Sequence, residues 1–267
     1  MTDAPNYFFA FVFGTMAGSF LNVCIHRLPK GESIVWPGSH CGSCRKPVRW
    51  HDNIPILSYV LLRGCCRDCK ARFSAEYLIV EAVAGAFFVL FYHRFGLTPE
   101  GGVLLVFALA LLTQAVIDFH HRIIPDVITL PGIAAGALLS ALLPGMHGAS
   151  GWLQGLIASG LGILVGGGFL WLLGVVAEFL LKKEAMGGGD VKLLAMIGAF
   201  IGVTGVAWTL FAGSLLGSVA GIYYKLFAKE EQIPFGPFLG AAAVGYLFFG
   251  RQVIDAYWNY VHRGFGY

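Results

Sequence analysis

The 267-residue chain is 57% hydrophobic and only 12% charged, with a mean hydropathy of +0.72. About a quarter of the residues of an ordinary soluble domain are charged, so this composition excludes a soluble protein and predicts that a bilayer surrounds the chain. The formal net charge of +3 requires no nucleic-acid partner, because it follows from how basic residues divide across a membrane.

Apolar runs long enough to cross a bilayer, which takes roughly 20 residues, recur along the chain. We expect single spans at Tyr7–Ile25, Tyr77–Phe95, Gly102–Phe119, Val127–Leu143 and Trp152–Leu181. The run Val191–Phe227 is too long for one span at about 1.5 Å per residue, so we expect it to break near Gly202–Gly205. With a last run from Pro237 to Gly250, the sequence predicts about eight transmembrane helices.

Basic residues indicate which loops face the cytoplasm, because Lys and Arg collect there. With eight spans both termini lie on one side, and 15 of the 18 Lys and Arg residues fall in loops on the other side. These 15 are Arg27, Lys30, Arg45, Lys46, Arg49, Arg63, Arg67, Lys70, Arg72, Arg122, Lys182, Lys183, Lys192, Lys225 and Lys229. The opposite side holds Arg94, Arg251 and Arg263. We therefore expect both termini outside and the first loop in the cytoplasm.

Five of the six cysteines fall in this first loop, which is too small to bury a large core without a staple. Two CxxC pairs, Cys41–Cys44 and Cys66–Cys69, are separated by 21 residues. Such pairs place thiolates about 2.3 Å from one tetrahedral zinc ion, and the reducing cytoplasm disfavours disulfides. Four sulfur ligands close the coordination shell, so the predicted zinc is structural, with a redox CxxC as the alternative. The predicted ligands are Cys41, Cys44, Cys66 and Cys69, with Cys65, His40 and His51 as competitors.

Acidic residues inside spanning segments are costly and usually functional. Asp118 lies near the cytoplasmic end of the third predicted span, and Asp190 begins the sixth on the same side. One shallow site can therefore contain both carboxylates. Asp126 follows Pro125, which fits a cap of the fourth span. For Asp190, an N-cap of the sixth span is as consistent with the sequence as a catalytic role.

Two carboxylates that share a site cannot both ionise easily. The ionised one can take a proton from water while the protonated one polarises a scissile carbonyl, which predicts peptide hydrolysis without a covalent intermediate or a metal. Gly187, Gly188 and Gly189 precede Asp190 and leave room for an extended peptide beside a strand-like segment. We also expect Glu81 and Glu178 to contact a basic substrate.

Six segments in a fixed order resemble the type IV prepilin peptidases over almost the whole chain. They are Gly18–Pro29, the two CxxC pairs, Asp52–Tyr59 between these pairs, Asp118–Asp126, Gly187–Asp190 and Ile233–Pro237. The resemblance implies a bacterial inner-membrane aspartyl protease of the glycine-x-glycine-aspartate type, with Asp118 and Asp190 as its catalytic residues. It also implies cleavage of the basic leader of type IV prepilins or type II secretion pseudopilins after a glycine.

The resemblance further implies N-methylation of the new terminus, with S-adenosylmethionine as the methyl donor. Glu76 and Leu78 stand where the family often has arginine and proline, which bears on methylation rather than on cleavage. The predicted fold is an all-α polytopic membrane protein with a small cytoplasmic zinc-binding insert. Its predicted parts are a first helix (residues 1–26), the insert (27–76) and a protease domain (77–267).

Three other functions are weighed against this one. A related intramembrane protease without methyltransferase activity would not need the zinc insert or the motif of the first span. A proton-coupled transporter would carry acids near the membrane midplane and inverted repeats. A zinc scaffold with a membrane anchor would not need eight helices.

Overall fold

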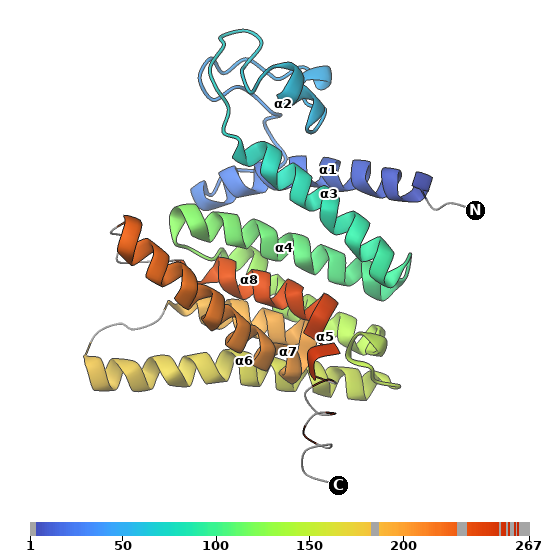
Figure 1. Ribbon diagram of the computed structural model, residues 1–267, viewed down its shortest axis with the longest axis vertical. Helices are drawn as coiled ribbons and strands as arrows, with labels where there is room; N and C mark the ends of the chain where they lie inside the picture. Colours follow the sequence, from blue (N-terminus) through green and yellow to red (C-terminus); the bar gives the residue numbers. More distant parts are fainter. Residues whose placement is uncertain are drawn as a thin grey trace. The chain divides into compact units, whose positions relative to one another are not determined.

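The computed structural model describes residues 4–182, 187–228, 234–250, 252–254, 256, 259 and 261, and it divides the chain into two compact units, Met1–Thr113 and Gln114–Tyr267 (Figure 1). Several residues used in the sequence predictions lie outside the described ranges. They are Lys183, Lys229, Ile233, Arg251 and Arg263. The predicted boundaries at residues 26 and 76 remain predictions.

Helices account for the regular structure of the described residues, and no strand occurs among them. The long helices are α1 (Ala4–Arg27), α3 (Glu76–Phe95), α4 (Pro99–His121), α5 (Asp126–Leu142), α6 (Trp152–Leu181), α7 (Gly188–Tyr223) and α8 (Gly236–Gly245). A five-residue helix, α2 (Leu57–Leu61), lies in the insert. The nearly all-helical prediction is therefore confirmed.

Five helical segments are long and apolar enough to cross a membrane, and two apolar segments are shorter. The five are Ala4–Lys30, Glu76–Phe95, Pro99–His121, Trp152–Leu180 and Gly188–Leu226, and the shorter two are Asp126–Leu142 and Gly236–Gly250. Helix α7 departs from helical geometry at Gly202, where φ is 68° and ψ is −173°. The break expected near Gly202–Gly205 is thus confirmed, while the count of eight spans remains a prediction.

In the first unit, α1 and α3 pack through small residues. A Cβ atom on Gly14 would lie 2.7 Å from the Cα atom of Gly85, and one on Gly18 would lie 2.7 Å from the Cα atom of Glu81. Small residues let helix backbones approach closely, which is how helices associate where lipid removes the hydrophobic drive between them. The outer face of α1 exposes Phe8 and Phe13, as expected for contact with lipid.

In the second unit, α7 packs against α5, α6 and α8, and Figure 1 shows it among them. Gly162 of α6 and Gly198 of α7 meet so closely that a Cβ atom on either would overlap the backbone of the other. The residues of α7 from Leu193 to Gly202 are buried without interruption. This packing fixes the first half of α7, which contains Asp190 in its first turn.

A polar cluster lies against the break in α7. The Ser140 hydroxyl donates to the Ala199 carbonyl oxygen at 3.1 Å and lies 2.8 Å from Nε2 of His147, which follows α5 in the 3₁₀ turn Pro144–His147. Since the hydroxyl has one hydrogen, it accepts the second bond from Nε2–H of a neutral imidazole. The ring covers Gly202, because a Cβ atom there would lie 3.2 Å from Nδ1 of His147.

The cluster predicts that acid destabilises the second unit. Burial lowers the pKa of His147 below its usual value of about 6.5, so the unfolded chain binds this proton more readily than the folded one. The contribution of His147 is complete above about pH 6.5 and is lost as the pH falls through the folded pKa. As the pH is lowered from 7.5 to 5.5, the midpoint temperature of thermal unfolding should therefore decrease more steeply for the wild type than for His147→Gln. Equal slopes would contradict the prediction, since all other histidines are common to both proteins.

Candidate active site and metal centre

Asp118 lies in the last turn of α4 and is only 5% exposed. Its Oδ2 atom accepts a hydrogen bond of 2.9 Å from the amide of Gly236, the first residue of α8. Segments that are 118 residues apart in the sequence thus meet at this carboxylate. The contact orients Asp118 and occupies one of its two oxygens.

Asp190 is the third residue of α7 and is partly buried. Its carboxylate lies near enough to that of Asp118 for the two to interact electrostatically. Among the described residues, no hydrogen bond to the Asp190 carboxylate occurs. The N-cap alternative is wrong, because Gly187 is the N-cap residue and no side-chain oxygen caps the helix.

The three glycines do not form the strand-like segment that the sequence predicted. Gly187 is extended, with φ −68° and ψ 129°, but α7 begins at Gly188 because the Asp190 amide bonds to the Gly187 carbonyl oxygen at 3.1 Å. Gly187 and Gly188 are exposed. The amides of a first helical turn lack partners within the helix, so this segment offers hydrogen-bond donors beside Asp190 rather than a sheet edge.

Asp126 is the first residue of α5 and does not cap it with its side chain, so the capping interpretation is wrong. Both carboxylate oxygens lie 2.8 Å from Nζ of Lys192 on α7. The ion pair connects the starts of α5 and α7. It gives Asp126 a partner that differs from those of Asp118 and Asp190.

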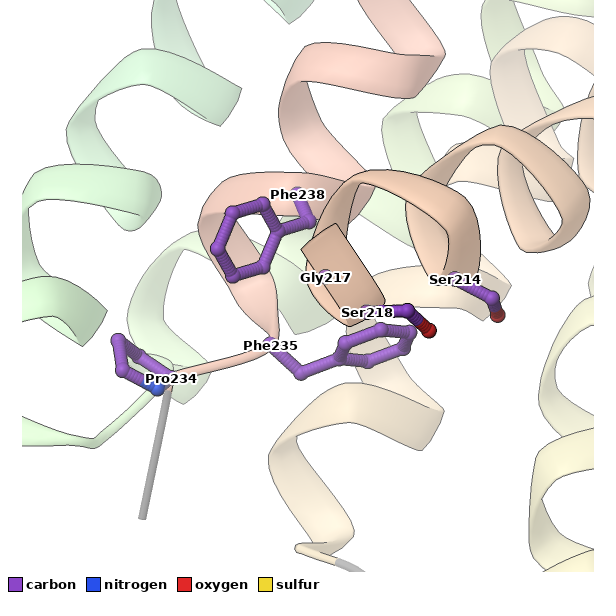
Figure 2. A pocket seen from close by; sticks show the side chains of 6 residues that line it. All are labelled: Ser214, Gly217, Ser218, Pro234, Phe235 and Phe238. Atoms are coloured by element: carbon purple, nitrogen blue, oxygen red, sulfur yellow. The ribbon is translucent and has the colours of Figure 1, made fainter. Parts of the chain in front are cut away.

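An open groove of about 290 Å³ is lined in part by Phe235, the residue before Gly236. Its lining comes from α7, from the two residues before α8 and from Phe238 of α8, and Figure 2 shows the Phe235 ring beside Ser218. The lining residues are Ser214, Gly217, Ser218, Pro234, Phe235 and Phe238. Phe235 directly precedes Gly236, whose amide binds the Asp118 carboxylate. One turn of chain therefore contributes both to the groove and to the contact with Asp118. From the sequence, no separate role was predicted for the run Ile233–Pro237.

The two predicted substrate glutamates differ in their surroundings. Glu81 of the first unit is 8% exposed, and its Oε2 atom accepts a hydrogen bond of 2.7 Å from the Ile56 amide. This bond connects α3 to the insert at Ile56, whose φ of 60° is unusual for a β-branched residue. Glu178 lies in the last turn of α6 and is exposed.

The four predicted zinc ligands come together in the insert. The sulfur atoms of Cys41, Cys44, Cys66 and Cys69 all lie within 4.8 Å of one another. Cys65 instead bonds the Arg63 carbonyl oxygen at 3.5 Å, and neither His40 nor His51 belongs to the cluster. The cluster can therefore hold a metal ion through the four sulfurs chosen from the CxxC spacing.

Each CxxC pair forms the same backbone turn. The amide of the first cysteine bonds to the carbonyl oxygen five residues later, at 2.9 Å for Cys41 and 2.8 Å for Cys66. The residue after each pair, Arg45 or Lys70, has a positive φ, of 56° and 61° respectively. Amides of Cys44 and Ser43 point at the first sulfur and lower the pKa of Cys41 to about 6. This favours the thiolate form that binds metal.

An ion pair outside the cluster supports the Cys66–Cys69 turn. The Arg67 guanidinium donates two hydrogen bonds to the Asp52 carboxylate, from Nη2 at 2.6 Å and from Nε at 2.8 Å. This bidentate contact lowers the pKa of Asp52. It joins the Cys66–Cys69 turn to the segment that leads to Ile56 and Glu81.

Two family models match the chain. The bacterial peptidase A24 N-terminal domain matches residues 12–95, which contain the cysteine cluster, and the type IV leader peptidase family matches residues 105–222, which contain both aspartates. The chain belongs to the type IV leader peptidase family. The resemblance inferred from the sequence is therefore confirmed.

Curated relatives are similar over nearly the whole chain, and each is named a prepilin leader peptidase/N-methyltransferase. The Neisseria gonorrhoeae protein is 34% identical over 95% of this chain and 92% of its own length. The proteins of Aeromonas salmonicida (35% identical, 92% of each) and Burkholderia pseudomallei (33%, 91% of this chain and 85% of the relative) are similar. No solved structure matches the chain.

Proposed function

We propose that the chain is a membrane endopeptidase that removes the leader of prepilins and then N-methylates the new terminus. The similarity to enzymes named for both activities over more than 90% of the chain supports this function. The observation that carries the peptidase chemistry is the electrostatic interaction between Asp118, in the last turn of α4, and Asp190, in the first turn of α7. The substrates are type IV prepilins or type II secretion pseudopilins, cut after a glycine.

The proposed hydrolysis uses the two aspartates as one unit. The ionised carboxylate takes a proton from water as its oxygen attacks the scissile carbonyl carbon, while the protonated carboxyl hydrogen-bonds the carbonyl oxygen. Collapse of the tetrahedral intermediate breaks the C–N bond, and the leaving nitrogen receives a proton from the pair. No covalent link to the enzyme is formed, and the products are the leader acid and the mature amine.

The surroundings of the pair suggest how the substrate lies. The exposed amides at Gly187 and Gly188 can receive carbonyl oxygens of the leader next to the cleaved bond. The groove beside Phe235 can receive an apolar side chain on the mature side of this bond. Burial of Glu81 against Ile56 suggests that it supports the insert, although its part in leader binding stays a prediction.

We propose a structural zinc ion for the four-cysteine cluster and S-adenosylmethionine as the methyl-donating substrate. The donor set of four convergent sulfurs fits zinc, which such a site binds tetrahedrally without an open position. We also propose a bacterial inner-membrane location with the insert in the cytoplasm, because the insert is rich in Lys and Arg. Labelling of the insert from outside intact cells by an impermeant thiol reagent would refute this topology.

The test of the function is incubation of the purified protein with a prepilin and isotopically labelled S-adenosylmethionine. We expect a loss of the leader mass and label on the new terminal nitrogen. A prepilin with its glycine before the cleaved bond replaced by a larger residue is the matched control. An intact wild-type prepilin after incubation would contradict the proposal.

Glu178 provides a separate prediction about the leader. An exposed carboxylate in the last turn of α6 can attract a basic leader, so Glu178→Lys should raise KM several-fold and leave kcat nearly unchanged. The comparison is kinetic, with a wild-type prepilin and one whose leader lysines and arginines are neutral. If KM is unchanged with the basic leader, Glu178 does not bind it.

A further inference from the structure

We infer that Gly236 is a positioning residue that holds Asp118 in the orientation needed to activate water. The inference rests on the proposed function and deepens it. Two properties of Gly236 support this inference. Its amide donates a hydrogen bond to the Asp118 carboxylate, and the carboxylate occupies the space that a side chain at position 236 would need.

The contact is close on both counts. The Gly236 nitrogen lies 2.9 Å from Oδ2 of Asp118. A Cβ atom on Gly236 would lie 2.7 Å from this oxygen, 3.2 Å from Cγ and 3.4 Å from the Asp118 Cβ atom. These are the three atoms nearest to such a Cβ, and Gly236 does not have a positive φ. Asp118 is therefore the obstacle that requires glycine here, and backbone strain is not the reason.

The amide is well suited to hold a charged oxygen. It is at the start of α8, where amides lack partners within the helix, and Pro237 after it has no amide hydrogen to offer. A hydrogen bond from an N–H group stabilises the ionised form of a carboxylate. Asp190 receives no such bond among the described residues. The geometry thus assigns the ionised, water-activating role to Asp118 and the proton-bearing role to Asp190.

The amide is also held firmly in place. Gly236, Leu239 and Gly240 are buried, and Leu239 is fully covered within the second unit. The Phe238 and Leu239 amides bond to the Phe235 carbonyl oxygen at 3.1 and 3.2 Å, which closes the first turn of α8. With one oxygen fixed by this turn, the Asp118 carboxylate is held in one orientation.

The experiment compares Gly236→Ala with Gly245→Ala on the same helix, where an added Cβ would meet nothing within 4 Å. Alanine at 236 must displace the carboxylate, and a misplacement near 1 Å costs about 100-fold in rate. We expect kcat for cleavage to fall about 100-fold with KM little changed. Methylation of a pilin that has already lost its leader should continue, and Gly245→Ala should keep both activities. Loss of methylation together with cleavage would mean a general structural role and would overturn the inference.

A stability cycle tests the contact without an activity measurement. In the wild-type background Gly236→Ala should lower the midpoint of thermal unfolding by about 5 °C, as overpacking does. In an Asp118→Ala background the same change should have almost no effect, because the obstacle is gone. Equal losses in both backgrounds would overturn the inference. If Gly236→Ala cleaves normally while Asp118→Asn is inactive, the inference fails and the proposed active site stands.

Discussion

We expect Asp118→Asn and Asp190→Asn each to reduce prepilin cleavage to background, a loss on the order of 10²- to 10⁴-fold or more. Asparagine keeps the shape of the side chain and can still accept a hydrogen bond from the Gly236 amide, but it cannot act as an acid or a base. Water attack on an amide needs one base and one acid, so removal of either stops the reaction. The measurement is cleavage of a prepilin in detergent or membranes.

Asp126→Asn is the matched control, because Asp126 lies in the same family segment as Asp118 but pairs with Lys192. Both side chains of this pair are about half exposed, and exposed ion pairs contribute only about 0–1 kcal/mol. The variant should therefore keep most of its activity. If Asp126→Asn were inactive and Asp118→Asn normal, the first aspartate would be misassigned.

Two further variants probe whether the aspartates act as a unit. The double variant Asp118→Asn/Asp190→Asn should be no slower than either single variant, since groups that act together are not additive. Glutamate at position 118 moves the carboxyl by one methylene and should cost about 100-fold. Normal cleavage by all of the asparagine variants would exclude the aspartyl protease mechanism.

Much of the fold follows from local patterns in the sequence. The apolar runs place α1, α3, α4, α5 and α6 within three residues of their observed bounds, because helix length and apolar composition are local properties. The run Val191–Phe227 is too long for one span, and this length predicted the break that the structure places at Gly202. The CxxC spacing identified the four cysteines that converge, because each turn of the cluster is built from consecutive residues.

Long-range contacts were not predictable in this way. Asp126 was interpreted as a cap because its position before an apolar run is typical of one, but its partner Lys192 lies 66 residues away. The approach of Gly162 to Gly198 and the amide of Gly236 on Asp118 also join distant segments. Propensity describes the start of a helix, whereas these contacts depend on how the helices pack. The glycine run before Asp190 shows the same limit, because helix α7 includes Gly188 and Gly189.

Removal of the metal ligands should have the other large effect, on the insert. Purified protein should contain about one zinc ion per chain, and Cys41→Ser or Cys69→Ser should lose it. Zinc binding supplies folding free energy to so small a unit. Without the zinc ion, the insert should become sensitive to limited proteolysis. Cys65→Ser is the matched control, because its sulfur lies next to the cluster in sequence but outside it.

The order of losses distinguishes a structural zinc from a catalytic one. The insert belongs to the first unit, whereas both aspartates belong to the second, so loss of zinc removes no group of the proposed hydrolysis. Cys41→Ser should therefore show proteolysis of the insert and a lower thermal midpoint, while intact protein at low temperature keeps measurable cleavage. Immediate loss of all cleavage with an insert that still resists protease would indicate a catalytic metal. Zinc retained by the variant lacking all four cysteines would place the metal at another site, because no sulfur ligand of the cluster would remain.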